Sequence, residues 1–256
     1  MKFCLAVLAV MAPSAVRADV AKASFLERAL VLPEHVVQIH TAYDLRFDNV
    51  GTTVHQVLLG FEVGVPGGLQ LGLSVVQRVT PNLGFDRLAV RAAYLAHDQI
   101  AVRVDGGVYD TKVYGQTPGF SGGMGVSLRI PLISDLIVLT SGRFTGLPPI
   151  GPRFSPWPSF SFADDLITVD VNALGPTGSV GVPIGVLMQL APGVAAGLRV
   201  GYRHTFGAYA TADYVPVGVD LLASGAIDVI VSAEMPRKLQ SAAAVYEGRV
   251  LLQARF

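Results

Sequence analysis

The most constraining feature of this sequence is an alternation of apolar and polar residues that recurs over residues 36–256. In the first example, mostly apolar residues occupy every second position from Val37 to Phe47, and polar residues such as Gln38 and His40 fall between them. A period of two is the side-chain period of a β-strand whose two faces meet different environments. The pattern therefore predicts strands with one apolar and one polar face.

Segments of this kind repeat along the chain and are separated by turn residues such as Pro66-Gly67-Gly68 and Ala191-Pro192-Gly193. Counting the closing segment near residues 245–256 gives about twelve strands, and single-chain bacterial membrane barrels have even strand numbers. We therefore predict an all-β fold, a transmembrane antiparallel up-and-down β-barrel. Alternation from Ile167 to Val171, inside the longest connection, leaves fourteen strands as an alternative.

The connections between these segments alternate in length, as they do in membrane barrels with short periplasmic turns and longer external loops. The expected short connections are 66–68, 96–99, 131–134, 191–193 and 223–225. The expected longer connections are 48–53, 79–86, 110–118, 145–178, 204–213 and 236–243. This arrangement places both chain termini at the periplasmic end and makes the proline-rich connection 145–178 an external loop.

The N-terminus has the pattern of a secretory signal peptide: Lys2, a short apolar run and small residues before an expected cleavage after Ala18. The run is shorter than the roughly 20 residues that a membrane-spanning helix needs. We therefore predict a signal peptide at 1–18 and a periplasmic N-terminal segment at 19–35. The single cysteine, Cys4, leaves with the signal peptide, so the mature chain cannot rely on disulfides.

Composition narrows the partners and the fold. Lys plus Arg and Asp plus Glu both number 19, so no net charge favours nucleic acid as a partner. A secreted β-sandwich or jelly roll is the alternative to a membrane barrel, because there too one face of each strand is buried against a second sheet. The polar faces of these segments carry Arg, Asp and Gly, which make a poor dry core because buried charges require partners.

The C-terminal segment ends in Phe256 and has further residues suited to a lipid face at alternate positions before it. These residues are Tyr246, Val250, Leu252, Ala254 and Phe256. The segment resembles the closing strand of Gram-negative outer-membrane β-barrel proteins, which include porin-like channels and transporters. The resemblance implies a place in the bacterial outer membrane, contact with its lipid and lipopolysaccharide, and recognition of this strand by the barrel-assembly machinery.

The charged residues of the polar face are the candidate site. With strand directions assigned, arginines fall toward the external mouth or slightly deeper, and they are Arg46, Arg78, Arg87, Arg91, Arg143, Arg199 and Arg203. The acidic residues expected nearer the periplasm are Glu62, Asp105, Asp135, Asp220 and Asp228. One interpretation is an anion-attracting pore, because rings of arginine bias a channel toward anions. The alternative is an interior cross-linked by charge pairs, with Asp44, Glu234 and Glu247 neutralising part of the arginine cluster.

No catalytic motif stands out, and the histidines show no spacing typical of metal ligands. We therefore expect neither an enzyme nor a bound metal or cofactor. The function that we expect is an outer-membrane channel or transporter for small solutes, with anion preference as its finer form. The alternatives are a structural or surface-interaction barrel with a closed, charge-paired lumen, and an outer-membrane lipid hydrolase or acyltransferase.

Overall fold

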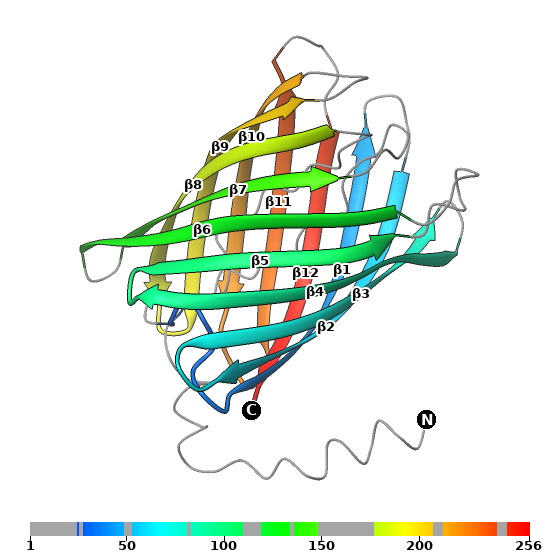
Figure 1. The fold of residues 1–256 in the computed structure, drawn as a ribbon. Helices are drawn as coiled ribbons and strands as arrows, with labels where there is room; N and C mark the ends of the chain where they lie inside the picture. The colour runs from blue at the N-terminus through cyan, green and yellow to red at the C-terminus, as the bar shows by residue number, and fades with distance from the viewer. Residues whose placement is uncertain are drawn as a thin grey trace.

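The computed structural model of this chain describes residues 25, 28–48, 53–80, 83–109, 119–133, 136–147, 177–206, 212–239 and 245–256. The expected signal peptide and most of the long connection 145–178 lie outside the described residues. The described part forms twelve strands arranged as a closed barrel (Figure 1). These strands are β1 (Val37–Asp48), β2 (Thr53–Val65), β3 (Leu69–Thr80), β4 (Gly84–His97), β5 (Ile100–Tyr109), β6 (Gly119–Ile133), β7 (Leu136–Leu147), β8 (Thr177–Ala191), β9 (Val194–Phe206), β10 (Ala212–Ala223), β11 (Asp228–Lys238) and β12 (Val245–Arg255).

The sheet is antiparallel throughout, and each strand pairs with its neighbours in sequence. The ring closes where β12 pairs with β1, so that the last strand, red in Figure 1, lies beside the first, blue strand. Closure leaves no sheet edge with unpaired backbone groups. It confirms the predicted up-and-down barrel. The alternative of fourteen strands is wrong, because β7 pairs directly with β8 on either side of the long connection.

The two faces of the sheet carry the side chains that the alternation predicts. Large apolar residues point outward and stay exposed, for example Leu59 at 61% and Leu198 at 66%. Polar residues such as Gln38 and Ser127 point inward and are fully buried. Within the part of the chain that the structure describes, no helix is long and apolar enough to cross a membrane.

Several strands extend further than the alternation of apolar residues predicts. The expected connection 79–86 is reduced to 81–83, because β3 continues to Thr80 and β4 already begins at Gly84. At the opposite end, β6 continues to Ile133 through the expected turn at 131–134. In both places backbone pairing continues where the alternation no longer marks a strand. Sequence patterning therefore located the strands but underestimated their length.

The N-terminal segment differs most from expectation. It was expected in the periplasm, but residues 28–36 lie against the inner wall of the barrel, at the end where β1 begins and β12 ends. Leu30 and Val31 pack in one buried cluster with the inward-facing Ala93 of β4 and Ala101 of β5. The segment then leads through Val36 into β1. Sequence alternation could not show this, because these residues form bends and turns rather than a strand.

Candidate functional site: the barrel lumen

One cluster of ion pairs in the lumen joins three neighbouring strands. Arg199 of β9 donates from Nε to Asp220 Oδ2 of β10 at 2.6 Å and from Nη1 to Glu234 Oε2 of β11 at 2.8 Å. The Ser232 hydroxyl donates to the other Asp220 oxygen at 2.5 Å. All four side chains are buried, so each charge requires these partners. The cluster therefore extends around the wall from β9 to β11.

A second set of pairs spans the seam between β12 and β1. Arg249 donates to both carboxylate oxygens of Asp44, with Nη2 2.6 Å from Oδ2. Nearer the ends of the same two strands, Arg46 Nε lies 3.3 Å from Glu247 Oε1. The arginine is on β12 in the first pair and on β1 in the second, so each strand contributes one arginine and one carboxylate. The charges at the seam are therefore compensated on both strands.

A β-bulge creates a further pair between β3 and β4. Val76 is opposite Arg87, but the next residue, Gln77, is opposite Phe85, so Asp86 is an extra residue on β4. An extra residue breaks the strict alternation of faces. Asp86 consequently points inward beside Arg87, and its carboxylate lies 3.6 Å from Arg78 Nη1.

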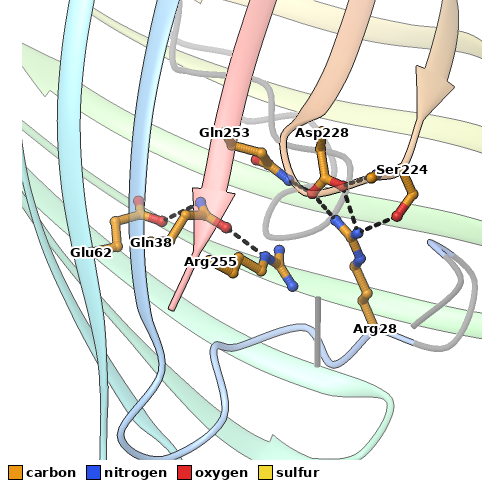
Figure 2. A network of polar contacts seen from close by, with 8 residues as sticks. Arg28, Gln38, Glu62, Ser224, Asp228, Gln253 and Arg255 are labelled. Atoms are coloured by element: carbon orange, nitrogen blue, oxygen red, sulfur yellow. Dashed lines mark hydrogen bonds and ion pairs between the residues drawn. The ribbon is translucent and has the colours of Figure 1, made fainter. Parts of the chain in front are cut away.

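Nearer the termini, the Glu62 carboxylate of β2 accepts hydrogen bonds from three strands. Gln38 Nε2 lies 3.2 Å away, Gln70 Nε2 3.0 Å and Arg91 Nη1 3.3 Å. Arg255 Nε continues this chain by donating to Gln38 Oε1 at 2.9 Å (Figure 2). These contacts too join strands that are adjacent or next but one in the ring.

Glycines make room for these long side chains to lie flat on the wall. Gly60 is directly opposite His40, Gly72 opposite Glu62 and Gly218 opposite Arg199. A Cβ atom on Gly60 would lie 2.0 Å from His40 Nε2, and one on Gly72 would lie 2.9 Å from Glu62 Cγ. A strand glycine of this kind marks close approach of a neighbouring group. The long side chains therefore extend over the adjacent strand.

The N-terminal segment makes a different kind of contact with the wall. Arg28 binds the Asp228 carboxylate with two hydrogen bonds, from Nη1 at 2.6 Å and from Nη2 at 2.9 Å. Arg28 Nη2 also donates to the Ser224 hydroxyl at 3.0 Å, and Gln253 Nε2 donates to Asp228 at 3.0 Å. Figure 2 shows Arg28 reaching from the segment to these wall residues. The guanidinium carbon also lies 4.1 Å from the centre of the Phe25 ring.

From Arg28 the segment continues to strands on other parts of the ring. Arg103 Nη2 of β5 donates to the Leu30 carbonyl at 2.8 Å, and the Leu32 amide donates to Gln70 Oε1 of β3 at 2.7 Å. At β2, a Cβ atom on Gly64 would lie 1.9 Å from the Pro33 carbonyl oxygen. Residues 28–36 thus touch β11, β5, β3 and β2 in turn.

No protein-family model and no curated protein matches this sequence. Among solved structures, the β domain of the Bordetella autotransporter BrkA aligns at 14% identity and a TM-score of 0.53, over 87% of this chain and 100% of that one. The NanC porin aligns at 10% identity and a TM-score of 0.51, over 84% and 98%. The KdgM porin in complex with disordered oligogalacturonate aligns at 11% identity and a TM-score of 0.50, over 85% and 99%.

The chain has the fold of the twelve-stranded outer-membrane barrels. Short connections lie on the periplasmic side of such barrels. Here the connections 66–68, 98–99, 192–193 and 224–227 share one end with the start of β1 and the end of β12, so we refer to that end as periplasmic by comparison with such barrels. Positive φ angles at Gly67, Gly68 and Gly193 allow the tight turns there.

The structure describes side chains for six of the seven predicted pore arginines, and all six lie on the lumen wall of the outer-membrane barrel. Arg46, Arg78, Arg91 and Arg199 are in the ion pairs given above. Arg203 lies 4.8 Å from the centre of the inward-facing Tyr214 ring. The remaining two are Arg87, which is buried, and Arg143, which faces Gly125 and Gly181 in the register but whose side chain lies outside the description.

Arginines were predicted toward the external mouth and carboxylates nearer the periplasm, and the structure shows this separation only in part. Carboxylates accompany the arginines on the external side, and these are Asp44, Asp86, Glu234 and Glu247. Arginines also occur toward the periplasmic end, and these are Arg28, Arg103 and Arg255. Asp135, expected among the periplasmic carboxylates, lies outside the described residues. The lumen therefore carries paired charge at both levels.

Sequence reasoning missed several polar residues that shape the lumen, Asp86 and Arg28 among them. Asp86 was missed because a bulge cannot be read from regular alternation. Arg28 was missed because it lies outside the repeating pattern, although the apolar residues that follow it, Leu30, Val31 and Leu32, were a signal of burial.

The predicted assembly residues lie on the closing strand as expected. Val250 and Leu252 point outward and are exposed, and Tyr246 stacks on Phe47 of β1 with ring centroids 5.1 Å apart. Ala254 is opposite Ile39. The Phe256 amide donates to the Val37 carbonyl at 2.8 Å, and the Val37 amide donates back to Phe256 at 2.9 Å. The terminal residue thus completes the seam.

Proposed function

We propose that this protein is a channel for small solutes in the bacterial outer membrane. The observation that supports this best is the direction of the lumen ion pairs. Each pair from Arg46, Arg78, Arg91, Arg199 and Arg249 runs to an adjacent or next-but-one strand. Glycines opposite the long side chains let them lie along the wall. A wall built in this way pairs its charges without requiring contact across the axis.

A structural barrel with a closed, charge-paired lumen remains the alternative from a different class. Its supporting observation is that many inward polar side chains are almost fully buried, Gln38 and Asp220 among them. The two functions require different arrangements of the lumen charges. Charge pairs that closed the barrel would connect opposite walls, whereas the pairs above connect neighbouring strands. We therefore favour the channel.

We further propose a weak preference for anions. The described arginines named on the external half of the lumen outnumber the carboxylates named there, which supports a slightly basic external mouth. Low-dielectric walls strengthen such a field. Because most of these arginines have carboxylate partners, we expect the preference to be modest. The KdgM porin has been solved in complex with oligogalacturonate, which carries carboxylates. Carboxylated solutes are therefore the first class to test.

The proposal includes passage only and no catalytic step, cofactor or metal. Its partners are outer-membrane lipid and lipopolysaccharide on the exposed apolar face, and the barrel-assembly machinery at the closing strand. Export by a cleaved signal peptide at residues 1–18 belongs to the same proposal.

Conductance in a planar bilayer tests the channel. Purified full-length protein should produce discrete ionic currents, and a salt gradient should give a reversal potential of the sign expected for anions. Currents with cation preference would reject the finer proposal alone. A correctly folded barrel that carries no current in any variant would favour the structural alternative.

A further inference from the structure

The N-terminal segment contacts widely separated parts of the lumen wall. The wall pairs join neighbouring strands, but residues 28–36 touch β11 through Arg28, β5 through Leu30, β3 through Leu32 and β2 through Pro33. In this ring of twelve strands β11 and β5 lie six positions apart in either direction, on opposite sides of the lumen, whereas β3 and β2 are neighbours beyond β5. A segment with such contacts runs across the lumen from one wall to the opposite wall at the periplasmic end.

We propose that residues 28–36 form a plug that closes the periplasmic end of the channel, and that the Arg28–Asp228 ion pair holds this plug in place. The inference rests on the proposed channel function and adds its regulation. Release of the plug opens the pore, and its return closes the pore. The segment is suited to this movement because its bends and turns precede the β1–β2 ladder, so its release breaks the backbone hydrogen bonds to Gly64 but leaves the pairing between strands intact.

The wall has a site shaped for the Arg28 guanidinium. Two hydrogen bonds to one carboxylate form a bidentate charge-assisted contact, the strongest arrangement available to arginine. Ser224 accepts a further hydrogen bond from Arg28, while Gln253 orients the carboxylate by donating to it. The side chains of Arg28 and Asp228 are only 1% and 4% exposed. Solvent therefore screens this pair little.

The wall is also shaped for the backbone of the plug. Gly64 has space for the Pro33 carbonyl only because it has no Cβ atom, and that oxygen would lie 1.9 Å from an added methyl group. Two backbone hydrogen bonds fix this contact, from His35 N to Gly64 O at 3.0 Å and from Gly64 N to Val36 O at 2.8 Å. Leu30 and Val31 pack with Ala93 and Ala101. The wall therefore binds the segment at three separate places: at Asp228, at Gly64, and at Ala93 with Ala101.

Two substitutions weaken the plug at different points. Arg28→Gln removes the ion pair, and Gly64→Ala displaces Pro33. Hydrogen bonds to charged groups contribute enough that losing the ion pair should raise the open-to-closed ratio about tenfold or more. Matched controls are Gln189→Ala, whose amide donates to carbonyls of the β8–β9 turn, and Gly248→Ala, where an added Cβ atom would lie 4.0 Å from the Ser232 carbonyl oxygen.

A cross-link locates the plug independently of current. The sequence has one cysteine, Cys4, within the expected signal peptide, so a mature chain carrying Leu30→Cys and Ala101→Cys has only the introduced pair. Oxidation should join these members of one cluster and shift the mobility of the denatured chain. The cross-linked protein should stay closed even with Arg28→Gln added, and reduction should open it.

Single-channel recording of full-length protein, both plug variants, both controls and a chain lacking residues 25–34 completes the test. We expect low open probability in the parent and controls, and high open probability in both variants and the deletion. Equal, high open probability in all six would overturn the plug while leaving the channel intact. If the chain lacking residues 25–34 folds but carries no current, the proposed channel function is wrong, and the plug, which would gate that channel, is wrong with it. A cross-link that fails to form would overturn the position of the plug.

Discussion

Arg249 of the last strand donates to both carboxylate oxygens of Asp44 in the first strand, which places a charged pair on the seam that closes the barrel. The two residues are 205 positions apart in sequence. The pair can form only when β12 has met β1, so it stabilises closure specifically. A pore needs this seam closed, because an open edge would leave backbone groups unpaired in lipid.

We expect Asp44→Asn to lower the free energy of unfolding by about 2 kcal/mol, because hydrogen bonds to a charged group are lost while both side chains stay on the wall. Urea unfolding in detergent micelles measures this change. Exchange of the two charges, Asp44→Arg with Arg249→Asp, should recover part of the loss. If the single substitution leaves stability unchanged, the seam pair contributes nothing to closure.

Replacement of Phe256 should reduce membrane assembly more than replacement of Trp157 in the long connection. Phe256 makes two backbone hydrogen bonds to Val37 and belongs to the predicted assembly signal. The measurement is the outer-membrane yield of Phe256→Ala and of Trp157→Ala, each compared with the parent. Similar yields for the two variants would remove the argument for a terminal recognition strand.

The glycines opposite long lumen side chains should be sensitive to a single added methyl group. On Gly218 a Cβ atom would lie 2.9 Å from Arg199 Nη2 and 3.1 Å from the Ala233 carbonyl oxygen, which is backbone and cannot rotate away. Overpacking of this kind costs about 1–3 kcal/mol. Gly218→Ala should therefore destabilise the barrel in urea, whereas Gly248→Ala, with its nearest contact at 4.0 Å, should not. Equal stabilities would show that the wall adapts freely.

Removing two arginines from the lumen should shift ion selectivity toward cations. Arg78→Gln leaves the Asp86 carboxylate without the guanidinium that lies 3.6 Å away, so the local charge becomes one unit less positive. Arg143→Gln is added because Arg143 belongs to the predicted basic set. Reversal potentials should shift most in dilute electrolyte, since the Debye length is about 10 Å at 0.1 M salt. An unchanged reversal potential in the double variant would contradict a basic external mouth.

The sequence predicts the faces of this barrel well because period two is a property of every strand. It assigns Gln38 and Arg199 to the lumen and Leu59 to the outside, and the structure confirms these positions. The partners of the lumen charges were harder to predict. Arg199 meets Asp220 and Glu234 because of the register of three strands, and register depends on turn lengths and bulges as well as on alternation.

The plug could not be predicted in the same way. Arg28 lies in a segment without repeating pattern, and its partner Asp228 is 200 residues away. A charged residue beside an apolar stretch is compatible with a periplasmic linker as well as with burial in a lumen. Only closure of the ring places the β10–β11 turn beside this segment.

Swelling of liposomes that contain the purified protein tests solute passage most directly. We compare the parent, Arg28→Gln and Gln189→Ala in sugars of increasing size. The proposed function predicts swelling in small sugars that declines as the sugar grows, with faster swelling for Arg28→Gln than for the parent or Gln189→Ala. A folded Arg28→Gln barrel that gives no swelling, and likewise none when residues 25–34 are removed, would contradict the claim that this barrel is a channel.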